Sequence, residues 1–233
     1  MPELTKARGR GTNVILGYGK FGRRAASCLQ KMIGRKDPII VVDQKIQSAS
    51  SIQGISFVRA EAIEWFSDYF TPTSEIARII PALPRHLAAG WLSAILSKEG
   101  WIVYPYILSD TLLEQLPHAI RVNRTSAVTS HADFLCPENC PEPRYICTHT
   151  RQPRPLPLYK LLRSLPLDLK GVFPIVVESR QFAPGIGGFF PEDLWEMLDF
   201  VKQLPQLPSR HLLIATACKC HGIVDGLILE RPT

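Results

Sequence analysis

Apolar and polar residues follow one another along the first half of the chain in blocks that predict alternating strands and helices. Short apolar runs predict strands at 13–17, 39–42, 54–58, 77–81 and 101–107. The stretches 20–33, 61–70 and 86–98 have the one-sided apolar spacing of amphipathic helices. Strands that alternate with helices are typical of βαβ units built on a mostly parallel sheet.

A proline-rich stretch interrupts this alternation. Six prolines lie at positions 137, 141, 143, 153, 155 and 157, so residues 136–157 favour an irregular loop. Beyond it the pattern predicts a helix over 158–165, a strand over 172–178, a helix over 191–203 and a strand over 211–216. We therefore predict an α/β fold: a doubly wound, mostly parallel Rossmann-like sheet, a Cys/His-rich and Pro-rich loop, and a C-terminal α/β extension. The predicted boundaries are a flexible basic N-terminus over 1–12, a dinucleotide-binding domain over 13–128, and the metal-site loop with its extension over 129–233.

The first strand runs directly into a glycine motif of the form G-x-G-x-x-G. Such a loop needs glycine for a tight turn, for close approach of the backbone to a pyrophosphate, and for close helix–strand packing. The second strand ends in Asp43, whose carboxylate can accept hydrogen bonds from ribose hydroxyls and repels a 2′-phosphate. The pattern favours NAD(H), or another adenosine nucleotide without that phosphate, at Gly17, Tyr18, Gly19, Lys20, Phe21, Gly22 and Asp43.

This N-terminal part resembles a known family. Over residues 13–107 the chain is similar to the nucleotide-binding domain (the TrkA-N or RCK type) of the bacterial potassium-uptake regulators. The resemblance is carried by Val14–Arg24, by Val41-Val42-Asp43 and by the stretch from Gly54 to Glu61. In that family a Gly-Asp-Ala follows the third strand, whereas Arg59-Ala60-Glu61 stands here. The resemblance implies a nucleotide-binding fold, and no stretch after residue 110 resembles the ligand-binding module of those regulators.

Five of the six cysteines form two clusters in the second half of the chain. Cys-x3-Cys spacing occurs in metal knuckles, and a proline-stiffened loop suits ligands held in fixed directions. Thiolates with a histidine suit tetrahedral zinc, and four thiolates suit zinc or an iron–sulfur cluster, so both stay open. The alternatives are reduced structural thiols or a redox disulfide. The predicted ligands are Cys136, Cys140, Cys147, Cys218, Cys220 and His221, with His149 next among the histidines.

A second glycine-rich stretch, 179–188, follows a strand and precedes a helix. It offers a possible anion or substrate loop at Arg180, Gly185, Gly187 and Gly188, because an arginine can hold a carboxylate or phosphate with two hydrogen bonds. An ordinary strand-to-helix connection explains these glycines equally well. The stretch lacks the Lys-Ser/Thr ending of a P-loop, so nucleotide hydrolysis is not indicated.

Composition narrows the function classes. The 233 residues are 45% hydrophobic and 21% charged, and the net charge of +6 is scattered, which does not favour nucleic-acid binding. No apolar run is long enough for a membrane span, and no signal peptide is recognisable. We expect a cytoplasmic protein that forms a homo-oligomer.

Two functions fit these features. The first is an NAD(H)-linked redox protein, such as an NAD-dependent oxidoreductase. Its cysteine site would carry electrons or polarise a substrate, and a redox partner would take part. The alternative is a non-catalytic nucleotide-sensing regulatory subunit with structural zinc, which would bind a transporter subunit. An S-adenosylmethionine- or nucleotide-dependent transferase is a third reading, which nothing beyond the glycine loop and Asp43 supports.

Overall fold

The computed structural model describes residues 11–33, 37–46, 52–165, 172–205, 207 and 209–231. These residues form two compact units. The first unit comprises the described residues up to Pro84 together with Gly188–Pro191, and the second comprises those of Arg85–Gly187 and from Glu192 onward. The predicted lead-in over 1–12 lies almost wholly outside the described residues. The predicted boundary near residue 128 falls inside the second unit.

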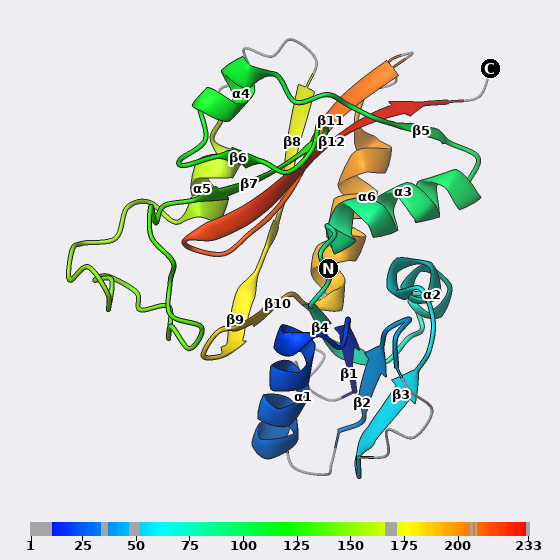
Figure 1. Ribbon diagram of the computed structural model, residues 1–233. Helices are drawn as coiled ribbons and strands as arrows, with labels where there is room; N and C mark the ends of the chain where they lie inside the picture. Colours follow the sequence, from blue (N-terminus) through cyan, green and yellow to red (C-terminus); the bar gives the residue numbers. More distant parts are fainter. Residues whose placement is uncertain are drawn as a thin grey trace, which may run out of the picture. The chain divides into compact units, whose positions relative to one another are not determined.

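The first unit is built on a four-stranded parallel sheet, sheet A, in the order β3-β2-β1-β4. Its strands are β1 (Thr12–Leu16), β2 (Ile39–Val42), β3 (Ile55–Val58) and β4 (Ile76–Pro81), and its helices are α1 (Lys20–Ile33) and α2 (Ala62–Tyr69). Strand β2 is wholly apolar, β1 ends in the apolar run Val14–Leu16, and both strands are mostly buried, as expected for the centre of a parallel sheet. The four strands predicted here and both helices are confirmed (Figure 1).

A segment from much later in the chain completes this unit. Phe189 forms two backbone hydrogen bonds of 3.0 Å with Ile79, so it lies alongside β4 and pairs with it through one antiparallel bridge. Phe189 is 1% exposed and Ile79 is fully buried, so the contact also adds apolar surface to the core.

The second unit is built on sheet B, which is mostly antiparallel. Among the described residues its strand order is β6-β7-β12-β11-β8, with β5 pairing with β12 beside β7. Its strands are β5 (Ile102–Pro105), β6 (Ile120–Arg121), β7 (Ser126–Ser130), β8 (Val172–Glu178), β11 (Ser209–Ala217) and β12 (His221–Glu230). Only β8 and β11 run parallel. The expectation of a mostly parallel sheet is therefore confirmed for the first unit and wrong for the second.

Helices cover both faces of sheet B: α3 (Leu87–Lys98) and α6 (Pro191–Gln203) on one face, α4 (Asp110–Glu114) and α5 (Leu158–Arg163) on the other (Figure 1). Alternate residues of β11 divide between these faces. Leu213, Ala215 and Ala217 pack in the core with α4 and α5. The intervening positions, including Thr216, therefore point to the face covered by α3.

Candidate functional site

The three glycines of the G-x-G-x-x-G loop occupy three different environments. Gly17 has a φ of +101°, and a Cβ on it would lie 2.4 Å from the carbonyl oxygen of Ala82. A Cβ on Gly22 would lie 1.9 Å from the carbonyl oxygen of Gly17. A Cβ on Gly19 would meet nothing within 4 Å. The first and third glycines are thus required by the turn and by the packing of α1 on it, whereas the second leaves open space.

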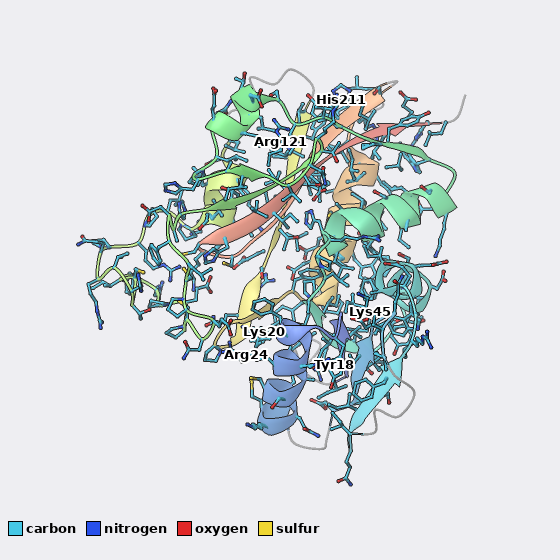
Figure 2. All side chains as sticks on the ribbon, viewed as in Figure 1. Tyr18, Lys20, Arg24, Lys45, Arg121 and His211 are labelled. Carbon is cyan, nitrogen blue, oxygen red and sulfur yellow. The ribbon has the colours of Figure 1, made fainter. Side chains whose placement is uncertain are left out.

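That open space lies at the beginning of α1. The first helical hydrogen bond runs from Arg23 N–H to the carbonyl of Gly19, so the amides of the first turn have no acceptor within the helix. No acidic residue stands in this turn, which begins with Lys20 and exposed Phe21. The positive end of the helix dipole and the nearby basic side chains favour an anion here. Figure 2 shows Tyr18, Lys20, Arg24 and Lys45 grouped at this end of the first unit.

Asp43 joins the end of β2 to the glycine loop. Its carboxylate accepts hydrogen bonds of 2.7 Å from the backbone N–H groups of Tyr18 and Lys45. The Tyr18 ring is held between the edge of Phe57 and the Arg23 guanidinium, at 5.1 and 5.4 Å. A carboxylate can accept about four hydrogen bonds, so two positions are left for a ligand's hydroxyl groups.

The stretch Arg59-Ala60-Glu61, which departs from the potassium-regulator pattern, makes hydrogen bonds that hold the local fold. Glu61 is the N-cap of α2, and its side chain accepts a hydrogen bond of 2.7 Å from Glu64 N–H. Arg59 donates from Nε to the carbonyl of Gln44 at 3.3 Å. Position 61 therefore begins a helix here.

The two cysteine clusters meet at the end of sheet B. Cys218 and Cys220 lie in the turn between β11 and β12, and His221 begins β12. The sequence did not predict this hairpin. The ends of the 131–157 loop bind this turn: His131 N–H donates to the carbonyl of Cys220 at 2.8 Å, and Leu158 N–H to that of Lys219 at 2.9 Å. All six cysteines lie in the described ranges and are free thiols.

The thiol of Cys136 lies among those of the other cluster members. Burial raises its pKa most, and the nearby thiols of Cys220, Cys140 and Cys147 raise it further. Arg154 donates from Nη2 to the sulfur of Cys220 and from Nη1 to the carbonyl of Pro143 at 2.6 Å. Four of the five predicted thiol ligands are thus close enough to interact electrostatically. Within the described residues, however, no three His, Cys, Asp or Glu side chains are already placed to hold one metal ion.

Backbone amides surround two of these sulfurs. Sγ of Cys218 accepts hydrogen bonds from the N–H groups of Cys220 at 3.4 Å and His221 at 3.3 Å. Cys147 similarly accepts from the backbone and the hydroxyl of Thr150 and from the backbone of His149, and these donors lower its pKa. Donors two and three residues after a cysteine stabilise its thiolate, the form that binds metals.

The histidines near the clusters have separate partners. Nδ1 of His221 lies 3.9 Å from Sγ of Cys218, and burial lowers its pKa. His149 stacks on Phe134, with ring centroids 4.3 Å apart. Nε2 of His131 lies 2.8 Å from the carbonyl oxygen of Leu156.

In reduced, metal-free protein, iodoacetamide at pH 8 is expected to alkylate Cys147 before Cys218. Burial raises the pKa of Cys218 to about 12, whereas amide donors lower that of Cys147. Since the thiolate is the reactive form, about one Cys218 in ten thousand would be ionised at that pH. Peptide mapping by mass spectrometry at successive times measures the order. Equal rates at both positions would contradict the environments described here.

The possible anion loop is a two-stranded sheet of β9 (Arg180–Ala183) and β10 (Ile186–Gly188). Gly185 has a φ of +73°, which serves the turn. A Cβ on Gly187 would meet Ser179 Oγ at 3.0 Å, and Gly188 starts the segment that belongs to the first unit. Arg180 lies 2.5 Å from a carboxylate oxygen of Asp193 and 3.7 Å from one of Glu178. The turn at Gly185 and the carboxylates beside Arg180 fit an ordinary connection between β8 and the helix that follows, which was the alternative to an anion-binding loop.

Sequence reasoning missed a polar cluster in the second unit. His86, which no motif singles out, contacts Asp225 and Thr216. These partners lie 139 and 130 positions away, so no local spacing could have identified them.

Residues 88–230 match the family model AF_1314_C, described as the C-terminal domain of an uncharacterized protein. The chain belongs to this family. The AF_1314_C match covers most of the second unit, including the five clustered cysteines. An uncharacterized protein of Archaeoglobus fulgidus is 29% identical over 231 residues, which cover 92% of this chain and 98% of that protein. No solved structure matches the chain. No helix among the described residues is both long and apolar enough to cross a membrane.

Proposed function

We propose that the first unit binds NAD(H) and that the chain is an NAD(H)-linked redox protein. The observation that carries the nucleotide proposal is the contrast between the glycines: Gly17 and Gly22 are packed against backbone, whereas the space at Gly19 is open at a helix N-terminus. The strand order β3-β2-β1-β4 agrees with the corresponding part of a doubly wound dinucleotide-binding sheet. Rossmann-type winding is part of this proposal.

Asp43 is proposed to select NADH over NADPH. Its half-buried carboxylate lies next to the glycine loop and would repel a 2′-phosphate while accepting bonds from ribose hydroxyls. We expect at least about tenfold tighter binding of NADH, corresponding to about 1.4 kcal/mol. In Asp43→Asn the preference should shrink, because the negative charge is lost.

Fluorescence titration with each nucleotide measures this preference. The ratio of the two affinities is the informative quantity, since a looser loop in the variant weakens both nucleotides alike. An unchanged ratio of affinities in Asp43→Asn would refute the role given to the carboxylate. Tighter binding of NADPH than of NADH by the wild type would contradict the proposed preference itself.

The second part of the proposal is a metal centre at the clustered cysteines. It is supported by four thiols from separate parts of the chain within electrostatic range, and by amide donors on Cys147 and Cys218. Zinc or an iron–sulfur cluster would be held by Cys136, Cys140, Cys147 and Cys220, with Cys218 and His221 as the alternative ligands. Because no three of these groups have metal-binding geometry, the 131–157 loop would have to close around the metal.

Protein purified without oxygen is expected to contain metal that is lost in Cys136→Ser. Cys28→Ser is the matched control, because Cys28 is also a partly buried free thiol but lies within α1. Elemental analysis with a visible absorption spectrum separates the candidates. Iron and sulfide with absorption that bleaches on reduction would support electron transfer, and colourless protein with zinc would favour the regulatory alternative. Metal-free wild-type protein would eliminate the metal centre and leave the nucleotide site unaffected.

A further inference from the structure

Four side chains of the second unit form one hydrogen-bonded chain. Nδ1 of His86 lies 2.6 Å from Oδ2 of Asp225 on β12, and its Nε2 lies 2.8 Å from Oγ1 of Thr216 on β11. Ser126 on β7 donates from Oγ to the other carboxylate oxygen of Asp225. A hydroxyl, an imidazole and a carboxylate are thus connected in the order found in nucleophilic catalytic triads.

For a neutral imidazole, one proton arrangement satisfies both contacts of the ring. An ionised carboxylate only accepts, so the Nδ1–H of His86 donates to Asp225. This leaves Nε2 as an acceptor, and the hydroxyl of Thr216 donates to it. The proton of the hydroxyl therefore points at a base that a carboxylate orients.

The strand register explains how these groups meet. Asp225 pairs with Ile214, two positions before Thr216 on β11, so Thr216 and Asp225 are diagonal neighbours on one face of sheet B. Diagonal neighbours are about 7–8 Å apart, and His86, at the start of α3, bridges them.

Burial also fits catalysis. The His86 side chain is 4% exposed and that of Asp225 17%, so the base is shielded from water, whereas Thr216 is partly exposed near the end of β11. His86 is the N-cap residue of α3, but its side chain makes no capping bond, so its ring is committed to Asp225 and Thr216.

We propose that Thr216, His86 and Asp225 form an acyl-transfer site that hydrolyses carboxylic esters. The Thr216 oxygen bonds to the ester carbonyl carbon while its proton passes to Nε2 of His86. The bond to the leaving oxygen then breaks, and His86 returns the proton to that oxygen as the alcohol leaves. Water attacks the acyl-threonine, again losing its proton to Nε2, and the released Thr216 oxygen recovers that proton. The net reaction consumes an ester and water and yields an acid and an alcohol.

The full chain incubated with p-nitrophenyl acetate tests this proposal, which is independent of the nucleotide and metal proposals. Peptide mapping should find an acetyl group on Thr216, with a burst of p-nitrophenolate. Thr216→Val should lower the rate by about 10³-fold, and Thr216→Ser should retain it. Thr129→Val is the matched control: Thr129 is also a strand threonine of sheet B, it is buried, and its hydroxyl bonds to the Pro117 carbonyl at 2.6 Å.

A purely structural network would give a different result. Hydrolysis by folded Thr216→Val at the wild-type rate, or acetylation confined to cysteines and lysines, would overturn the proposal. If Thr216→Val does not fold, the acetylation map of the wild type still decides. Asp225→Asn then provides the second variant, because asparagine has the same size and shape as aspartate. The substitution should lower the rate of ester hydrolysis by about 10⁴-fold, because the amide no longer holds the His86 imidazole in the tautomer that accepts a proton at Nε2.

Discussion

Gly22→Ala is expected to destabilise the first unit by about 3 kcal/mol, the upper part of the usual range for overpacking. The added Cβ would lie 1.9 Å from the carbonyl oxygen of Gly17, and this oxygen belongs to the backbone. Gly17 has little freedom to move away: its N–H bonds to the carbonyl of Val42 at 2.8 Å, and its φ is +101°. Helix α1 would have to separate from the turn after β1.

Urea unfolding followed by circular dichroism measures this effect. Gly19→Ala is the matched control from the same motif, because its Cβ would meet nothing within 4 Å. Position 19 precedes α1 directly, where glycine is preferred over alanine. The free energy of unfolding of this control should therefore fall by at most about 1 kcal/mol. Equal unfolding midpoints for Gly22→Ala and the wild type would show that the loop is not packed as described.

Gly19→Val is expected to have the opposite profile, with stability nearly retained and NADH affinity lowered by about 10²-fold or more. The branched side chain would fill the open space through which a pyrophosphate approaches the backbone, while its Cβ meets no atom within 4 Å. Calorimetric titration with NADH measures the affinity, and urea unfolding confirms that the variant is folded. A folded Gly19→Val protein that binds NADH as tightly as the wild type would remove the glycine loop from the proposed site.

The first unit could be predicted well because its signals are local. Strands β1 and β2 are short apolar runs, and the turn between β1 and α1 needs glycines at fixed spacing, which the printed sequence displays directly. Asp43 was identified for the same reason, since it ends the second strand. Its bonds to Tyr18 and Lys45 could not be predicted, because they depend on how β1 and β2 pair.

The second unit was predicted less well because its organisation depends on distant pairing. The sequence indicates β11 as its last strand, but β12 follows and pairs with it as an antiparallel hairpin. Strand β5 was expected in the parallel sheet and instead pairs antiparallel with β12. Arg180 looked available for an anion, yet Asp193 on the following helix lies within hydrogen-bonding distance of it.

Binding of NAD(H) by the glycine loop of the first unit is the proposal on which the redox function depends. Chemical-shift mapping of ¹⁵N-labelled protein during titration with NADH is its most direct test, because the spectra report which backbone amides a ligand reaches. We expect saturable shifts, at one nucleotide per chain, confined mainly to the amides of residues 17–23 and of Asp43 and Lys45. Unchanged spectra at millimolar NADH, or shifts located away from that loop, would contradict it.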